Sequence, residues 1–295
     1  MSVRLIEGLP HLYRGKGKDL YDIPGRPDSI LQVCRNTLST HNVVHATEVE
    51  GKGALITALT LFMHFSVLDG IPNHIEEFGR DIYLVLPEGD YEPDLHHRAL
   101  VVKRARTPDT EFIFRSHLAG SLARALKEEG TDPYNLGLSR HLPLMFRFPQ
   151  PLFTPTEKSK DDRPLPASVV CERYPIETSL ALKAFRQAQQ YLYRRGLALI
   201  DAKFELVDGM LIDDWLNGDC SRIARLSDIH EGEEPPFLDK EIFRQIAIRN
   251  WNGGKKVPLT FTDREIKQGL GGYHEAFSLI TGMTLREFQK FYLDV

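Results

Sequence analysis

The sequence is poor in cysteine and has no long apolar run. Its 295 residues include three cysteines, and their positions lack the spacing of a metal site. A sparse, odd number of cysteines argues against a disulfide framework and is typical of a reducing compartment. No apolar stretch approaches the length of about 20 residues that spans a membrane, and the first residues lack the pattern of a secretory signal. We therefore expect a cytoplasmic, globular protein that does not enter a membrane.

An excess of positive charge is also missing. The formal net charge is -4, and no arm or stripe of the chain is strongly basic. This balance argues against a nucleic-acid partner. Hydrophobic residues make up 42% and charged residues 26%, as in ordinary globular proteins, and the length allows a large core. We expect two joined lobes, an N-terminal one at residues 1–105 and a C-terminal one at residues 106–295.

A P-loop is absent, but a turn rich in glycine and lysine stands near the N-terminus. Residues 8–23 are predicted to form two strands that flank the sequence RGKGK at 14–18. Gly17 would allow the backbone to approach a ligand, and Lys16 and Lys18 supply charge for phosphates. The motif G-x-x-x-x-G-K-[ST] does not occur. A plain hairpin turn is the alternative interpretation.

The rest of the first lobe is predicted to be an antiparallel sheet with one helix, an arrangement suited to holding a nucleotide. The apolar residues 54–68 predict a buried helix, and the polar residues 37–53 predict an irregular loop long enough to cover a ligand. Lys103 lies in an apolar segment, where it either extends to solvent or pairs with a nucleotide phosphate. Strands are predicted at 29–34, 81–86, 99–105 and 111–115.

Residues 197–222, LALIDAKFELVDGMLIDDWLNGDCSR, carry the densest group of charged side chains. Apolar and charged residues alternate from Asp201 to Glu205, which predicts a strand with its charges on one face. The turn signal Asp208-Gly209 then predicts a hairpin that can bring Glu205 close to Asp213. Two carboxylates are a common way to hold Mg²⁺, with phosphates and water completing its coordination. A charged hairpin that faces solvent is the alternative.

Two segments predict the binding of an anion. Arg115 and Ser121 lie where a strand passes into a helix that runs to about residue 130, and the backbone N–H groups at such a helix start favour an anion. The alternative is that both are ordinary surface residues. Asp219, Ser221 and Arg222 directly follow the predicted hairpin and form a second anion-binding element.

The remaining segments of the second lobe are mostly helical. A long amphipathic helix is predicted at residues 176–196, with Gly196 as its C-cap. Another helix begins near Asp239, and two more close the chain. The proline-rich residues 131–175 show little periodicity and are predicted to be irregular.

Six motifs resemble those of the phosphoribosylaminoimidazole-succinocarboxamide synthases (SAICAR synthetases), a family of de novo purine synthesis. They occur in the family's order and at similar spacing over nearly the whole chain, and the ordered set is more specific than any one motif. The motifs are LYRGKGKDLY at 12–21, RSHLAGSL at 115–122, PLFTPTEK at 151–158, DAKFEL at 201–206, DDWLNGDCSR at 213–222 and DKEIFR at 239–244.

The resemblance implies an α+β, two-lobed SAICAR synthetase-like (ATP-grasp/kinase-like) fold with antiparallel sheets and ATP in the cleft between the lobes. It implies that ATP and Mg²⁺ drive the joining of a carboxylate to an amine. The carboxylate is that of 5-amino-1-(5-phosphoribosyl)imidazole-4-carboxylate (CAIR), the amine is that of L-aspartate, and ADP and phosphate are released. The family also implies a homo-oligomer, which no feature of the sequence argues on its own.

The resemblance further implies a set of site residues, position by position. The ATP phosphates would be held by Lys16, Gly17 and Lys18, with Lys103 nearby. Mg²⁺ would be held by Glu205 and Asp213. The ribose 5-phosphate would be bound by Arg115, Ser121 and Arg222, and Ser39 is a further substrate-binding candidate. Lys203 would lie near the reacting carboxylate and Asp219 near the substrate.

Several positions depart from the family pattern. Thr37 and Asn42 stand where aspartates are frequent, and the acidic, asparagine-bearing stretch that usually follows Lys158 is missing, with LPASVV at 165–170 near its place. The nucleotide, metal and phosphate residues are therefore better retained than those around the heterocycle and the amine. A divergent synthase of the purine pathway fits this pattern, and so does a related ligase with a different carboxylate or amine. A catalytically silent nucleotide-binding protein is a third hypothesis, against which the retained metal carboxylates argue.

Overall fold

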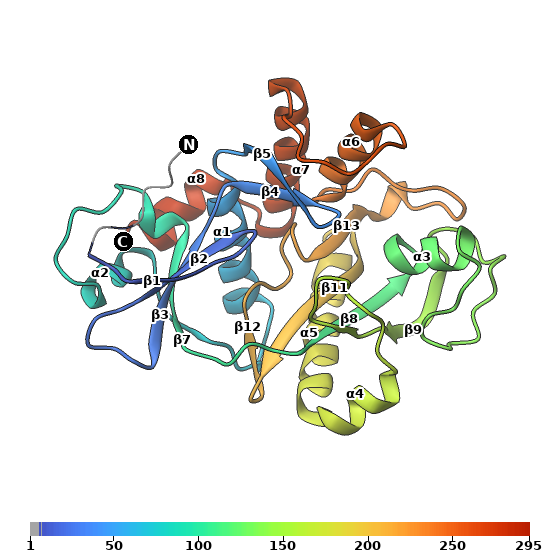
Figure 1. Cartoon of the computed structure of the whole chain (residues 1–295), viewed down its shortest axis with the longest axis horizontal. Coiled ribbons are helices and arrows are strands. Elements are labelled where there is room, and N and C mark those ends of the chain that lie inside the picture. Colours follow the sequence, from blue (N-terminus) through green and yellow to red (C-terminus); the bar gives the residue numbers. More distant parts are fainter. Residues whose placement is uncertain (1–5, 7) are drawn as a thin grey trace. The chain divides into compact units, whose positions relative to one another are not determined.

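The chain forms two compact units, here called unit 1 and unit 2, whose elements are labelled in Figure 1. The structure, a computed structural model, describes residue 6 and residues 8–295. Within these, unit 1 comprises the chain up to residue 61 together with 74–105 and 243–295, and unit 2 comprises 62–73 and 106–242. The chain passes from unit 1 to unit 2 after residue 105, and residues 243–295 group with unit 1.

Unit 1 is built on a five-stranded antiparallel sheet with the strand order β1-β2-β3-β7-β6. All residues of the central strand β3 are buried, and its bounds match the strand predicted at 29–34. The two strands predicted around the RGKGK turn are also confirmed. The strands are β1 (His11–Arg14), β2 (Lys18–Asp22), β3 (Ser29–Cys34), β6 (Ile75–Phe78) and β7 (Ala99–Lys103).

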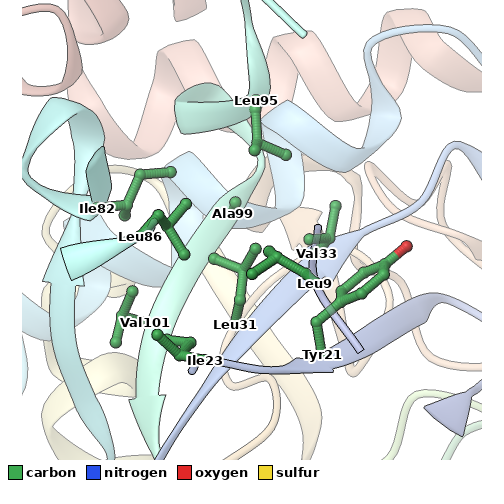
Figure 2. Close-up of a cluster of buried hydrophobic side chains, with 10 residues drawn as sticks. All are labelled: Leu9, Tyr21, Ile23, Leu31, Val33, Ile82, Leu86, Leu95, Ala99 and Val101. Carbon is green, nitrogen blue, oxygen red and sulfur yellow. The ribbon is translucent and has the colours of Figure 1, made fainter. Parts of the chain in front are cut away.

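The core of unit 1 packs against this sheet, as Figure 2 shows. Leu31 and Val33 of β3 alternate along the strand and meet Val101 of β7, so one face of the sheet carries the apolar side chains. Ile82 and Leu86 cover these residues from a short helical segment. This segment consists of η1 (Gly79–Asp81) and α2 (Ile82–Val85).

The strand predicted at residues 81–86 is wrong, because this segment is helical. Its residues after Asp81 are apolar or aromatic, so alternation alone could not separate the two structures. The pattern of burial explains the outcome. Ile82 and Leu86 are buried four residues apart, whereas Leu84 is 81% exposed, which suits one face of a helix and not one face of a strand.

The prediction of an irregular loop at residues 37–53 is also wrong for most of its length. Strands β4 (Thr37–Thr40) and β5 (Val43–Glu48) form a two-stranded antiparallel sheet. His41 and Asn42 connect them with φ of 48° and 64°, and two consecutive left-handed residues are typical of a tight hairpin turn. The C-terminal part of the chain holds this hairpin, since backbone N–H of Ala46 donates to the carbonyl of Leu259 at 3.0 Å.

Helices complete unit 1. The buried helix predicted at 54–68 is confirmed as α1 (Lys52–Ser66), which begins in unit 1 and ends in unit 2. The helices predicted after residue 239 are confirmed as well. The ring of Phe243 packs against Gly269, where a Cβ would clash with it. They are α6 (Glu241–Trp251), α7 (Asp263–Thr281), α8 (Leu285–Phe288) and the π-helical turn η4 (Gln289–Leu293), and a further turn, η2 (Leu95–His97), precedes β7.

Unit 2 contains a six-stranded antiparallel sheet around β8 and β11. The path runs β10-β8-β11-β12, while β13 also pairs with β11 and β9 with β8. The strands are β8 (Thr110–His117), β9 (Arg147–Phe153), β10 (Thr156–Glu157), β11 (Leu197–Val207), β12 (Met210–Ile212) and β13 (Ser221–Arg225). The helical elements are α3 (Gly120–Lys127), α4 (Ala167–Arg173), α5 (Pro175–Tyr193) and the turn η3 (Leu226–Asp228).

Helix α5 covers the sheet of unit 2 and confirms the helix predicted at 176–196. Its buried side includes Ala181, Ala184 and Ala188, and small residues let a helix approach a sheet closely. Phe185 lies among these alanines with its ring 6.0 Å from that of Phe114 in β8. This packing fixes β8 and β11, the strands that carry Arg115, Lys203 and Glu205 of the predicted site.

Residues 131–175 are more regular than predicted, since they contain β9, β10 and α4. Pro149 and Pro151 in β9 concealed the strand, because proline is usually excluded from a sheet interior. β9 pairs only with β8 and is therefore an edge strand, where proline is tolerated. Within residues 6 and 8–295, no helix is both long enough and apolar enough to cross a membrane.

Candidate active site

The glycine- and lysine-rich turn of unit 1 is held by its backbone. The N–H of Gly15 donates to the carbonyl of Lys18 at 2.7 Å, and the hydroxyl of Thr37 donates to the carbonyl of Lys16 at 2.6 Å. The Nζ of Lys16 donates to the side-chain oxygen of Asn42 at 2.8 Å. A Cβ on Gly17 would meet no atom within 4 Å, so a ligand can approach the backbone there.

Lys103 lies at the other end of this sheet. In the register of unit 1, Lys18 is opposite Cys34 at one end of β3, and Lys103 is opposite Ser29 at the other. Five residues of strand separate these ends, which corresponds to about 17 Å. This corrects the expectation that Lys103 lies near Lys16 and Lys18. Ser39, the further substrate-binding candidate, pairs with Val44 in the β4–β5 sheet.

The charged residues of β11 form a tightly paired cluster in unit 2. The Nζ of Lys203 donates to Oε1 of Glu205 and to Oε1 of Glu111, each at 2.9 Å. The carboxylate of Glu205 is 2% exposed, and its second oxygen accepts a hydrogen bond from Lys158. The cluster therefore joins two acidic and two basic side chains from β8, β11 and the segment after β10.

Asp213 belongs to the same cluster. Glu205 is opposite Ile212 in the β11–β12 hairpin, and Asp213 follows directly with a φ of 63°. The hairpin itself is confirmed, and its turn at Asp208 and Gly209 has φ of 51° and 73°, as the two-residue turn signal predicts. Glu205 and Asp213 both act on the ammonium of Lys203.

The pKa of Lys203 follows from this surrounding. Burial alone would lower the pKa of Lys203, but the carboxylates of Glu205, Glu111 and Asp213 outweigh it and hold the pKa well above the usual lysine value. Lys203 therefore keeps its proton at neutral pH. Its side chain can stabilise negative charge on a ligand, but it is not suited to accept a proton.

Glu111 and Lys158 were not among the predicted site residues. Glu111 directly precedes the apolar run Phe112–Phe114 of β8, and its second oxygen accepts a hydrogen bond from the hydroxyl of Thr156 at 2.9 Å. An acid beside this apolar run was the available signal. Lys158 is the last residue of the motif PLFTPTEK. This position in a family motif was the available signal, although the partner of Lys158 could not be predicted.

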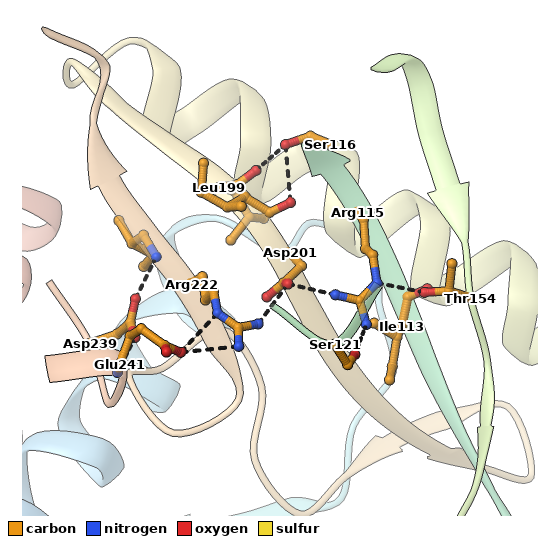
Figure 3. A network of polar contacts seen from close by, with 12 residues as sticks. Ile113, Arg115, Ser116, Ser121, Thr154, Leu199, Asp201, Arg222, Asp239 and Glu241 are labelled. Carbon is orange, nitrogen blue, oxygen red and sulfur yellow. Dashed lines mark hydrogen bonds and ion pairs between the residues drawn. The ribbon is translucent and has the colours of Figure 1, made fainter. Parts of the chain in front are cut away.

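A second cluster joins the predicted anion-binding residues, as Figure 3 shows. Oδ2 of Asp201 accepts hydrogen bonds from Arg115 at 2.9 Å and from Arg222 at 2.8 Å. Arg115 also donates to the hydroxyls of Thr154 at 2.9 Å and Ser121 at 3.0 Å. Three residues from the two predicted anion elements, Arg115, Ser121 and Arg222, are therefore brought together around one carboxylate.

Both guanidinium groups remain charged. Burial and the positive charge of Arg222 lower the pKa of Arg115 and outweigh the opposite effect of Asp201, but an arginine with a lowered pKa is still protonated at neutral pH. For Arg222 burial is outweighed by Asp201 and Glu241, which raise its pKa. Each guanidinium has five N–H donors, more than these contacts use. The two arginines can therefore bind a phosphate while Asp201 orients their side chains.

The motif residues around this cluster have structural roles that fit the same site. A Cβ on Gly120 would lie 2.6 Å from Nη1 of Arg222, and the φ of Gly120 is +58°, so glycine is required at the start of α3. Asp239 is fully buried and accepts hydrogen bonds from backbone N–H of Ile223 at 2.8 Å and Glu241 at 2.7 Å. The motif DKEIFR thus positions Glu241 against Arg222.

Asp219 lies apart from the two arginines and has Lys240 as its neighbour, with 3.5 Å between Nζ and Oδ2. Its backbone N–H donates to the side chain of Asn217, which is fully buried. Burial raises the pKa of the neighbouring Cys220 thiol to about 12, so this cysteine is a packed side chain and not a nucleophile.

The sequence and the fold match one known family. The profile of SAICAR synthetases matches residues 11–259. A phosphoribosylaminoimidazole-succinocarboxamide synthase of Mannheimia succiniciproducens is 32% identical over 289 residues, covering 92% of this chain and 98% of the relative. One from Pichia angusta is 28% identical over 294 residues, covering 94% of this chain and 96% of the relative.

Solved structures agree with this similarity. A SAICAR synthase of Saccharomyces cerevisiae in complex with SAICAR superposes with a TM-score of 0.82 at 25% identity, covering 96% of this chain and 98% of the other. A type-2 SAICAR synthetase in complex with ADP has the same fold with a TM-score of 0.63 at 20% identity. The chain belongs to the SAICAR synthetase family of ATP-dependent ligases.

Proposed function

We propose that this protein joins the carboxylate of CAIR to the amino group of L-aspartate, with ATP converted to ADP and phosphate. Family membership supports the reaction class. The observation that carries the proposal is the single face of β11, on which Asp201, Lys203 and Glu205 follow at every second residue. Asp201 orients two arginines suited to a phosphate, and Glu205 with Lys203 forms a cluster suited to a carboxylate and a metal.

The spacing on this strand suits a ribotide substrate. Asp201 and Glu205 are separated by four residues, which corresponds to about 13 Å along a strand, a length of the order of a nucleoside monophosphate. Arg115, Ser121 and Arg222 would bind the 5-phosphate at one end. Lys203 would face the reacting carboxylate at the other, where its fixed positive charge stabilises the negative charge that develops on the oxygens.

The chemistry requires ATP because a carboxylate is a poor electrophile. Transfer of a phosphoryl group from ATP to the CAIR carboxylate gives an acyl phosphate and ADP. The amine of aspartate then attacks the acyl carbon, and phosphate leaves. No protein nucleophile is needed, which agrees with the buried, high-pKa thiol of Cys220. Lys16 and Lys18, beside the open backbone of Gly17, would hold the ATP phosphates.

The residues present fit Mg²⁺. Glu205 is a buried carboxylate next to Asp213, and Lys158 and Lys203 pair with it. Oxygen donors of this kind are the ligands that Mg²⁺ prefers, so Glu205 and Asp213 would hold it. When bound, Mg²⁺ neutralises charge on the phosphoryl group that is transferred.

A second candidate function is a related amide ligase with a different carboxylate or amine. It is favoured by the segments at 35–42 and 159–170, which depart from the family pattern. The first segment forms β4 and a turn in which the side chain of Asn42 accepts a hydrogen bond from Lys16. The phosphate and carboxylate clusters would serve such an enzyme equally well, because they do not recognise the heterocycle or the amine.

The test is coupled ADP release with ATP, Mg²⁺, CAIR and L-aspartate, in which each component is omitted in turn. Turnover that requires all four establishes the proposed reaction. Turnover with CAIR but with another amine, or with aspartate but another carboxylate, would instead establish the second candidate. A protein that binds Mg-ATP but releases no ADP with any such pair would overturn both.

A further inference from the structure

Unit 1 holds a group of two histidines and one aspartate that the proposed reaction does not use. Nε2 of His96 lies 2.8 Å from Oδ1 of Asp294, and Nε2 of His97 lies 2.7 Å from the same oxygen. The three atoms lie within 4.8 Å of one another, which no other set of three His, Cys, Asp or Glu side chains achieves within residues 6 and 8–295. The adjacent residues His96 and His97 thus both direct Nε2 at Oδ1 of Asp294.

Both imidazoles also have an oxygen partner at their other nitrogen. Nδ1 of His96 lies 3.2 Å from the hydroxyl of Tyr83, and Nδ1 of His97 lies 3.9 Å from a carboxylate oxygen of Asp94. Histidines that bind metals usually donate their second N–H to a carboxylate, carbonyl or similar acceptor, which fixes the ring and leaves the first nitrogen for the metal. Tyr83 is placed to be this acceptor for His96, and Asp94 lies within ion-pair distance of His97.

The group is rigid on one side and open on the other. His96 is 3% exposed, whereas the side chains of His97 and Asp294 are 16% and 35% exposed. His97, Asp294 and Asp94 line a pocket of about 830 Å³. An ion can therefore reach His97 and Asp294 from this pocket, and water can complete its coordination there.

We propose that His96, His97 and Asp294 form a binding site for a divalent transition-metal ion of the zinc class. Two imidazoles and one carboxylate suit Zn²⁺, Co²⁺ or Ni²⁺, whereas Mg²⁺ prefers oxygen donors alone, so this site is distinct from the one assigned to Mg²⁺. In the metal-bound form the imidazole of His96 donates a hydrogen bond from Nδ1 to the hydroxyl of Tyr83.

The site has a structural consequence for the end of the chain. His96 and His97 lie in η2, and Asp294 follows η4 near the C-terminus. The backbone of Leu293 packs closely on Gly79, because a Cβ added to Gly79 would lie 2.9 Å from the Cα of Leu293. A bound ion would hold these two distant segments of unit 1 together, and metal binding of this kind adds to folding stability.

The experiment is titration of the full chain with zinc chloride alone, after treatment with a chelator, by isothermal calorimetry. Cys171 is an exposed thiol and is replaced in all samples by serine so that it does not bind the metal. We expect one Zn²⁺ per chain and a higher melting temperature with Zn²⁺ than without it. Magnesium chloride at the same concentration is expected to give neither signal at this site.

Three variants and one control locate the site. His97→Gln and Asp294→Asn remove one donor each and are expected to weaken Zn²⁺ binding at least tenfold and to abolish the gain in melting temperature. Tyr83→Phe removes only the outer partner and is expected to weaken binding by about tenfold. His141→Gln changes an exposed histidine of unit 2 and should bind as the parent does.

The result that overturns the proposal is independent of the catalytic assay. No saturable Zn²⁺ binding by the parent chain would do so, as would parent-like affinity in both His97→Gln and Asp294→Asn. Because Tyr83→Phe leaves all three donors in place, it keeps the test valid if either donor variant folds poorly.

Discussion

At the scale of single residues, Asp201 holds the anion-binding part of the site together. It accepts hydrogen bonds from Arg115 and Arg222, which would otherwise place two positive charges side by side in a buried region. Breaking a buried ion pair by removing one partner costs about 3–5 kcal/mol. Asp201 is therefore a positioning residue, whose loss would be felt in stability as well as in binding.

A substitution at Asp213 distinguishes a role in metal binding from a role in stability. We expect Asp213→Asn to lower kcat by about 100-fold or more, because the amide lacks the charge that a metal ligand supplies. Asparagine tolerates left-handed backbone, so the φ of 63° at this position is kept and the melting temperature should change little. Steady-state ADP release and thermal unfolding are the measurements.

The matched control is Asp208→Asn in the turn of the same hairpin. Asp208 is exposed and also has a left-handed φ, of 51°, but lies away from Lys203 in the register. Wild-type kcat is expected for this variant. An Asp213→Asn protein with wild-type kcat would refute the metal assignment.

His117 gives a prediction for acid stability. Burial, with a contribution from Arg147, lowers the pKa of His117 to about 4, below the ordinary value of 6.5. The unfolded chain binds this proton first, so the stabilisation is complete above pH 6.5 and is lost as the pH falls toward 4. Between pH 7 and pH 5 the loss is at most about 2 kcal/mol.

We therefore expect His117→Gln to reduce the drop in the urea midpoint between pH 7 and pH 5. The exposed His141→Gln should retain the parent's full drop. An equal drop in the parent and in His117→Gln would show that this histidine does not contribute to acid sensitivity.

The residues that could be predicted from sequence are those whose partners are local or share a strand. Lys203 and Glu205 alternate on β11, and Asp213 follows a turn that the sequence marks clearly. Glu111 reaches the same cluster from β8 and Lys158 from the segment after β10. Their partners depend on the β8–β11 and β8–β10 pairings, which local pattern does not specify. The misplacement of Lys103 has the same origin, since it depended on the register of β3 and β7.

At the scale of elements, the start of α7 offers a test of local stability. The hydroxyl of Thr262 accepts a hydrogen bond from the N–H of Glu265 at 3.3 Å, and Glu265 accepts one from the N–H of Thr262 at 2.8 Å. We expect Thr262→Ala to destabilise the protein by about 1 kcal/mol through loss of this capping box. The measurement is the shift of the denaturation midpoint.

Thr260→Ala is the control for this variant, because Thr260 is an exposed threonine two residues earlier. It should shift the midpoint much less. Equal shifts in the two variants would show that the capping bonds add nothing beyond the change of residue type.

Elements with a clear period or turn signal were predictable, and the failures have specific causes. The helices α1 and α5 and the strand β3 follow from their apolar patterns. The segment at 82–85 became helical because tertiary packing selected one face of an apolar run. β4 and β5 were missed because their residues are polar, although His41 and Asn42 mark a tight turn.

At the scale of the whole molecule, residues 243–295 matter more than their distance from the predicted site residues suggests. All predicted site residues precede residue 243, yet unit 1 includes the helices that follow it. Backbone N–H of Leu259 donates to His45 at 3.1 Å, and that of Phe261 donates to Thr47 at 2.8 Å, which ties the β4–β5 sheet to this part of the chain.

We expect a chain truncated after Ile242 to lose Mg-ATP binding and its cooperative thermal transition for unit 1. The reason is that buried side chains such as Phe243 and Phe277 are removed from the core. Calorimetric titration with Mg-ATP and circular dichroism on heating are the measurements. Removal of Val295 alone, which is 79% exposed, is the control and should have no effect. Nucleotide binding by the truncated chain at parent affinity would contradict the expectation.

The division of unit 1 between both parts of the chain also sets an order of events during synthesis. Every residue of unit 2 has been made once the ribosome passes residue 242, whereas unit 1 still lacks residues 243–295. At about 5–20 residues per second, this interval lasts several seconds. Unit 2 therefore has the chance to fold first, while the β4–β5 sheet still lacks the hydrogen-bond partners that Leu259 and Phe261 supply.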